Sequence, residues 1–126
     1  IYIHVKRSLV TPLLADFDVA DTDASCAVRF STTQPTQALN LLNSEFVNDQ
    51  AEGLARRVAA ENTADLRSKI GLALNLATSR APDNSEIDGG LAFVEAMQRE
   101  HGLDEPQAFE RFCLLALNLN EFMFID

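Results

Sequence analysis

Four aspartates, Asp16, Asp18, Asp21 and Asp23, form the densest group of side chains in the sequence that could bind a metal ion. The calcium loop of an EF-hand needs a glycine at its sixth position and a glutamate at its twelfth. Counting from Asp16 places Asp21 and Ala27 at these positions, and counting from Asp21 fails in the same way. We therefore predict no metal site and interpret the aspartates as turn-forming residues of a loop. A calcium-stabilised carbohydrate-binding surface at this loop is the weakest of three hypotheses about the function of the chain; the other two are given at the end of this section.

The two histidines and two cysteines match no local catalytic or metal-binding motif. His4 and His101 are far apart in the chain, so only the fold could bring a second ligand to either. Cys26 and Cys113 form neither C-x-x-C nor C-x-x-C-H, which excludes a local redox motif and a local haem attachment. Cys113 is most simply a small core side chain. A disulfide between the two cysteines stays open and would require an oxidising compartment.

The charge balance disfavours two classes of partner. The chain of 126 residues has 19 acidic and 10 basic residues and a net charge of −9. Nucleic acids and anionic membrane surfaces would gain nothing from such a partner, and no apolar run approaches the ~18 residues of a membrane span. We expect no nucleic-acid binding and no membrane span. The length of 126 residues predicts one helical domain, residues 1–126. The start at Ile1, within a strand-like pattern, suggests that this domain is a fragment of a larger multidomain protein.

The longest predicted element is a helix that begins at Pro35, whose fixed φ suits a first helical turn, and runs to Ala60. Its apolar residues form two stripes with helical spacing, the first of Leu39, Leu42 and Phe46 and the second of Val47, Ala51, Leu54 and Val58. The stripes point in different directions, so we expect the helix to bend near Asn48 or to change packing partners.

Three further helices follow from their start and stop signals. The first spans roughly residues 64–79, with Asn62–Thr63 as its cap, and its apolar residues lie on two faces. The second is capped by Asp83 or Asn84, carries Glu86 in a capping box, and ends at Gly102. The third opens at Asp104-Glu105-Pro106, and its part from Phe112 to Leu119 is apolar nearly all round, as expected for a helix in the middle of a domain or against a second domain.

These elements predict a mostly α fold, a bundle of about four to five helices around the long bent helix. The two ends of the chain are strand-like. We predict that Ile1 to Val5 and Phe122 to Ile125 form a short two-stranded antiparallel ribbon that joins the termini, with helices packed on it.

The sequences of several segments resemble one known family. The most distinctive segment runs from Asp21 to Phe46, with Cys26, Arg29, the run from Thr32 to Leu39, and the run from Leu41 to Phe46. Residues Lys6 to Leu9 and Ala116 to Phe122 fit the same family. Together these segments resemble the C-terminal part of planctomycete-specific domain one, a family of unknown function, and the resemblance spans nearly the whole chain.

The resemblance implies a setting for the chain. Members of the family belong to large exported proteins of planctomycetes and related bacteria, which often carry a cytochrome c-like domain upstream and are suspected of serving polysaccharide breakdown or periplasmic redox work. The resemblance thus implies a periplasmic or otherwise exported location. This chain has no C-x-x-C-H, so we expect no cofactor in it, and any haem would lie in the upstream part of the parent protein.

The resemblance supplies candidate residues but no established catalytic ones. The matching polar side chains Arg29, Gln37, Asn43 and Glu45 are candidates for substrate binding, and a hydrogen-bonded core is the favoured interpretation. The first hypothesis is a non-catalytic structural or interaction module that contacts other domains of its parent chain. The alternative is a lobe of an enzyme or binding surface for complex polysaccharides, with Asp21, Arg29, Gln37 and Glu45 along a cleft. The sequence leaves open whether the chain is an enzyme.

Overall fold

A computed structural model describes residues 35–61 and 65–123, and within these ranges the chain is mostly helical, with six helices and no strand. The mostly α fold class is confirmed for this part of the chain. The chain divides into two compact units, residues 1–44 and 45–126, which are described separately below. The prediction that residues 1–126 form one domain stays a prediction. The helices are α2 (Pro35–Asn43) in the first unit and α3 (Glu45–Glu61), α4 (Leu66–Thr78), α5 (Asn84–His101), α6 (Glu105–Ala116) and α7 (Asn120–Met123) in the second.

The single long helix is not confirmed, because α2 ends at Asn43 and α3 begins at Glu45. The Asn43 side chain donates its Nδ2 to the carbonyl of Leu39 at 2.9 Å, and the Ser44 N–H donates to the carbonyl of Leu41 at 3.2 Å. The second bond spans three residues, as in the tightened last turn of a helix. Polar side chains such as Asn and Ser compete for backbone partners in this way and favour helix ends over helix interiors.

The two predicted stripes have different outcomes. In the second stripe, Ala51 and Val58 are fully buried, and Val47 and Leu54 pack against the core as predicted. The side chains of the first stripe are exposed instead, with relative exposures of 58% for Leu39, 41% for Leu42 and 61% for Phe46. The first stripe is therefore no core face of the described helices.

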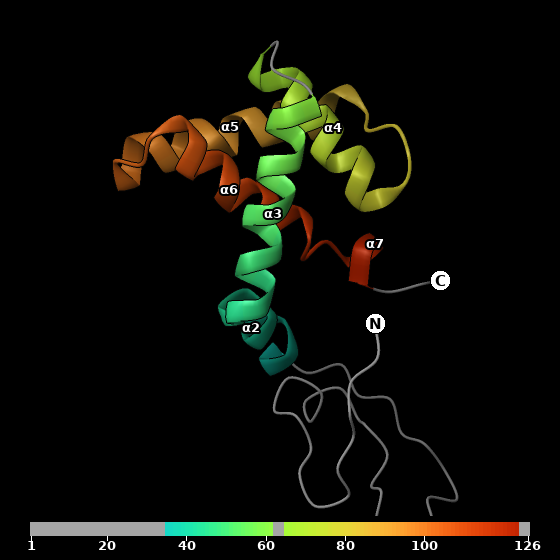
Figure 1. Ribbon diagram of the computed structural model, residues 1–126, viewed down its shortest axis with the longest axis vertical. Helices are drawn as coiled ribbons and strands as arrows, with labels where there is room; N and C mark the ends of the chain where they lie inside the picture. The colour runs from blue at the N-terminus through green and yellow to red at the C-terminus, as the bar shows by residue number, and fades with distance from the viewer. Residues whose placement is uncertain (1–34, 62–64, 124–126) are drawn as a thin grey trace, which may run out of the picture. The chain divides into compact units, whose positions relative to one another are not determined.

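Helix α6 lies at the centre of the second unit, as its all-round apolar sequence predicted. It packs against α3, α4 and α5, and Figure 1 shows it passing behind α3 and lying alongside α5. It supplies six buried side chains, more than any other described helix: Ala108, Phe109, Phe112, Cys113, Leu114 and Ala116. Helix α4 contributes Ile70, Ala73 and Leu74, and its half-buried Leu66, Leu72 and Leu76 confirm that it is covered on more than one side.

Cys113 is one of these core residues, and it is a free thiol with 0% exposure. Burial, and secondarily the negative charge of Glu110, raises the pKa of Cys113 to about 12. The thiol is thus protonated at neutral pH and packs as a small apolar side chain, as expected. Cys26 lies outside the described residues.

The cap of α4 differs from the prediction. Asp65 is the capping residue, and its carboxylate accepts the Ser68 N–H at 2.7 Å. Asn62 and Thr63, the predicted cap, lie outside the described residues. Hydrogen bonds from the backbone and side chain of Ser68 lower the pKa of Asp65. An ionised carboxylate is a strong cap because it also meets the positive end of the helix dipole, which explains why Asp65 takes this role.

The caps of α5 and α6 are as predicted. Asp83 and Glu86 form a reciprocal capping box at the start of α5, and Asp104 with Gln107 repeats the arrangement at the start of α6. Gly102 ends α5 with a φ of 67°, in the left-handed region that glycine occupies at no steric cost.

The predicted ribbon between the termini is not confirmed. Phe122 and Met123 belong to α7, and both of their N–H groups donate to the carbonyl of Leu119, at 2.9 and 3.0 Å. This local turn uses backbone donors that an antiparallel partner would need, so the strand prediction is wrong for these two residues. The proposed partner strand, Ile1 to Val5, lies outside the described residues. Among the helices of residues 35–61 and 65–123, none is both long and apolar enough to cross a membrane.

Candidate functional site

The structure describes three of the four predicted substrate-binding residues. Gln37 is buried in the first unit, with 6% exposure. Asn43 is exposed and bonds to its own helix, and Glu45 is exposed in the first turn of α3. Arg29 lies outside the described residues. The substrate-binding interpretation therefore stays a prediction.

The described part of the chain holds no group of three or more His, Cys, Asp or Glu side chains that could bind a metal ion. The aspartate-rich loop of residues 16–23 lies outside it. His101, the described histidine, is exposed at the end of α5.

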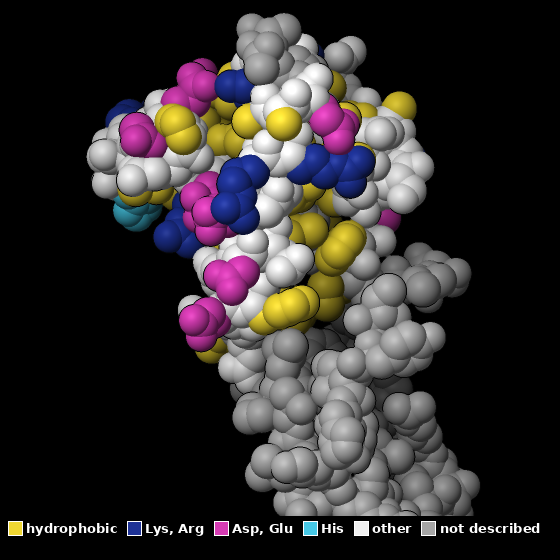
Figure 2. Space-filling view, viewed as in Figure 1, with side chains coloured by type: hydrophobic (Ala, Val, Ile, Leu, Met, Phe, Trp, Pro, Cys, Tyr) yellow, Lys and Arg dark blue, Asp and Glu magenta, His cyan; other side chains and the backbone are white. Residues whose placement is uncertain are grey.

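A groove of about 290 Å³ lies in the second unit between α3, α4 and α6. Its floor is apolar and its rim carries charges of both signs, and Figure 2 shows basic and acidic side chains mixed along α3. Ligand pockets for small molecules usually start near 300 Å³, so the groove has room for one side chain or a short segment. The lining residues are Glu52, Ala55, Arg56, Ala59, Lys69, Glu105, Pro106, Phe109 and Glu110.

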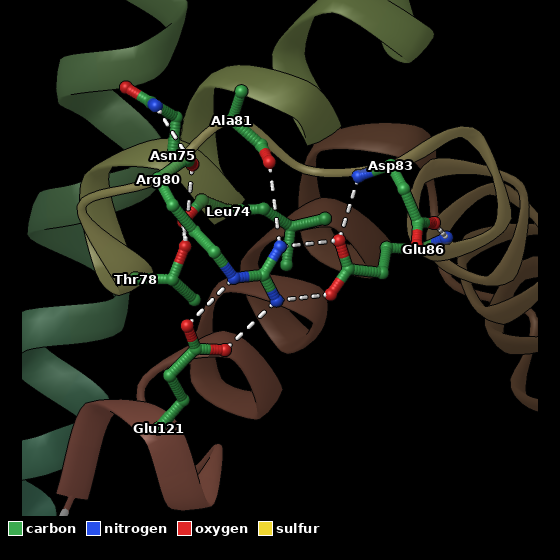
Figure 3. Close-up of polar contacts among 8 residues, drawn as sticks. All are labelled: Leu74, Asn75, Thr78, Arg80, Ala81, Asp83, Glu86 and Glu121. Atoms are coloured by element: carbon green, nitrogen blue, oxygen red, sulfur yellow. Dashed lines mark hydrogen bonds and ion pairs between the residues drawn. The ribbon is translucent and has the colours of Figure 1, made fainter. Parts of the chain in front are cut away.

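A polar cluster of the second unit is centred on Arg80, in the connection between α4 and α5 (Figure 3). The Arg80 guanidinium donates to both oxygens of Glu121, from Nε at 2.7 Å and from Nη2 at 2.9 Å. It also donates to both oxygens of Glu86, with Nη1 to Oε2 at 2.9 Å and Nη2 to Oε1 at 2.5 Å. Two bidentate carboxylate pairs on one guanidinium are charge-assisted and geometrically specific. We call Arg80, Glu86 and Glu121 the arginine hub.

Local backbone structure presents Arg80 to its partners. Ser79 ends α4 in the left-handed conformation with a φ of 58°, which turns the chain out of the helix axis. The Arg80 carbonyl then accepts from the side chain of Asn75 at 2.9 Å, which fixes the turn. On the other side, Glu86 also accepts the Asp83 N–H at 2.8 Å as part of the capping box. The hub thus joins the end of α4, the start of α5 and α7.

The hub keeps both carboxylates ionised. The hydrogen bonds from Arg80 and from the Asp83 N–H lower the pKa of Glu86 to about 2. The hydrogen bonds from Arg80 also lower the pKa of Glu121, and the two carboxylates in turn raise the pKa of Arg80. A general acid or base at neutral pH needs a pKa near 7, so these groups suit a structural role and not proton transfer.

No sequence signal identifies this hub. Glu86 is predicted as part of a capping box, but neither Arg80 nor Glu121 has a predicted role. Arg80 and Glu121 are 41 positions apart, so no local spacing rule connects them.

Comparison with known proteins yields one match. A scan against protein families matches residues 1–94 to PSD1, described as a protein of unknown function (DUF1553). Searches among curated proteins and among solved structures return no match. The matched residues are well over half of the 126, so the family resemblance seen in the sequence is confirmed. The chain belongs to the PSD1 family of proteins of unknown function.

Proposed function

We propose that the chain is a non-catalytic structural or interaction module that packs against other domains of a larger parent protein. The observation that carries this proposal is the exposure of large apolar side chains on the second unit: 61% for Phe46, 40% for Leu115 and 44% for Phe122. These residues come from α3, α6 and α7. Single exposed apolar residues are ordinary, but three large ones on one unit are candidates for an interaction surface.

The packing of α3 against α6 brings two of these side chains to the same end of the unit. Arg111 of α6 donates to the Asn48 side chain of α3 at 3.1 Å. The groove, farther along α3, is lined by Ala59 and by Pro106 from the start of α6. The two helices therefore run antiparallel. Phe46 precedes Asn48 and Leu115 follows Arg111, so both lie where α3 begins and α6 ends.

The third exposed side chain, Phe122, belongs to α7. Helix α7 begins four residues after α6 ends, and the arginine hub holds it through Glu121. The neighbouring Phe122 side chain is left exposed. We call Phe46, Leu115 and Phe122 the apolar end of the second unit. Its proposed contacts are with other domains of the parent protein, and we further propose that this parent is periplasmic or otherwise exported.

The experiment that tests this proposal is hydroxyl-radical footprinting with mass spectrometry, applied to the 126-residue chain and to the longer parent protein. Oxidation of Phe46, Leu115 and Phe122 is expected to fall several-fold in the parent, because another domain covers them. His101, which is exposed at the far end of α5, serves as the internal reference and is expected to oxidise equally in both.

A matched pair of variants completes the design. Phe122→Asp in the parent is expected to restore oxidation of Phe46 and Leu115, because a buried unpaired charge disrupts an apolar contact. Ala92→Asp, at an exposed position of α5, is the control and is expected to change nothing. Equal oxidation of the apolar end in the chain and in the parent would refute the proposed contact.

A further inference from the structure

The groove between α3 and α6 has features that the proposed function does not use. Its floor is formed by Ala55 and Phe109, with Ala59 and Pro106 at its exposed margin, and these four side chains offer only apolar surface. Its rim carries carboxylates from both helices. A group that fits here must therefore have an apolar body and a polar tip.

The charges at the rim do not balance. Arg56 pairs with Glu52 at 3.3 Å, and Lys69 pairs with Glu105 at 3.5 Å. Glu110 is the remaining charged lining residue, and within residues 35–61 and 65–123 it has no ion-pair partner. The rim thus keeps one negative charge in excess, three carboxylates against two cations.

Glu110 is suited to attract a cation in spite of its modest exposure. Its side chain is half-buried on α6, and its charge is felt inside the core, since it contributes to the raised pKa of Cys113. Charges near a low-dielectric surface interact more strongly than charges in open water. An anionic ligand is disfavoured because both cations of the rim already have carboxylate partners.

We propose that this groove receives a lysine or arginine side chain from a basic protein segment. The methylenes of such a side chain would lie over Ala55, Ala59 and Phe109, and its cation would meet Glu110. Lysine and arginine combine an apolar stem with a charged head in this way, and the volume of about 290 Å³ accommodates one such side chain with part of its backbone. The inference is independent of the apolar end, which lies at the other end of the α3 and α6 pair.

The test uses butylguanidinium, a mimic of an arginine side chain, and butylurea, its neutral isostere. Each is titrated into the isotopically labelled 126-residue chain, and backbone amide shifts are followed by NMR. Butylguanidinium is expected to shift the amides of residues 52–59 and 105–110 in a saturable manner. Butylurea is expected to bind more weakly at the same place, since it contacts the floor but not Glu110.

Variants separate charge recognition from shape. Glu110→Gln is expected to weaken butylguanidinium binding about threefold, the effect of one ion pair at a partly exposed site. Glu95→Gln, an exposed carboxylate of α5, is the matched control and should leave the affinity unchanged. Ala59→Leu fills the groove from its exposed margin and is expected to abolish the shifts while Glu110 is intact.

Three results would overturn the proposal. Equal affinity for butylurea and butylguanidinium would show that the groove recognises only apolar surface. Unchanged affinity in Glu110→Gln would show that this carboxylate does not select the cation. Shifts located outside residues 52–59 and 105–110 would place the binding elsewhere.

Discussion

Two adjacent glycines of α5 are expected to respond in opposite directions to the same substitution. A Cβ added at Gly89 would meet no atom within 4 Å, whereas a Cβ at Gly90 would lie 2.7 Å from Cγ2 of Ile70 and 2.9 Å from Cε2 of Phe112. Both neighbours belong to the core, with exposures of 0% and 3%. Gly90 is thus the position where α5 approaches α4 and α6 most closely, and only a residue without Cβ fits there.

Whether alanine stabilises the protein at each position depends on two opposing free energies, the gain from backbone entropy and the cost of overpacking. Replacing glycine by alanine inside a helix raises the free energy of unfolding by about 0.5–1 kcal/mol, because glycine loses more backbone freedom on folding. Gly89→Ala is expected to show this gain undiminished. At Gly90 the added methyl overpacks the core at a cost of about 1–3 kcal/mol. Gly90→Ala is therefore expected to lower the free energy of unfolding, and the two variants should differ by about 1–3 kcal/mol.

Urea unfolding followed by circular dichroism at fixed pH measures both variants. A double variant, Gly90→Ala with Phe112→Leu, removes the ring atoms nearest the new methyl, so its loss of stability is expected to be smaller than the sum of the two single losses. If Gly90→Ala proved as stable as Gly89→Ala, the close packing of α5 against Ile70 and Phe112 would be refuted.

Two further predictions concern the hub and a helix end. Because Glu86 has a pKa of about 2 when folded against an ordinary value of 4.5, the folded state binds fewer protons than the unfolded state between these values. The stabilisation by Glu86 is complete above about pH 4.5 and is lost as the pH falls toward 2. Over this interval the free energy of unfolding of the wild type should therefore decline more steeply than that of Arg80→Leu, which urea titrations at several pH values would measure. Parallel curves would contradict the role of the hub. Gly102→Ala should lower the free energy of unfolding by about 1 kcal/mol, because Gly102 has a positive φ. Gly53→Ala should raise it, because Gly53 is helical and a Cβ there would also meet no neighbour. Thermal unfolding measures both changes, and changes of the same sign would contradict the assigned backbone conformations.

The helices of the second unit were largely predictable from the sequence because their signals are local. Asp83 with Glu86, and Gly102 at the far end, fix both ends of α5 within a few residues of chain. The apolar spacing of Ala51 and Val58 likewise marks the buried face of α3. These features need no knowledge of distant residues.

The interruption at Ser44 and the helical turn at Phe122 were missed for a common reason. Both depend on competition between nearly equal backbone arrangements. At Ser44, polar side chains favour the end of a helix over its continuation. At Phe122, the residues are strand-like, but the N–H groups of Phe122 and Met123 already donate to the carbonyl of Leu119 in a helical turn. Short apolar segments do not distinguish a strand from a helical turn by periodicity.

The ion pairs of the arginine hub could not have been predicted, since any of 10 basic residues could meet any of 19 acidic ones and an exposed pair contributes too little to impose a sequence pattern. The fold alone selects Glu86 and Glu121 as the partners of Arg80.

The exposed apolar side chains of the second unit are a separate case. The all-round apolar pattern of α6 predicted a helix in the middle of a domain or against a second domain, and Leu115 of this helix is 40% exposed. An exposed apolar side chain on such a helix supports the proposal that the apolar end contacts another domain of the parent protein.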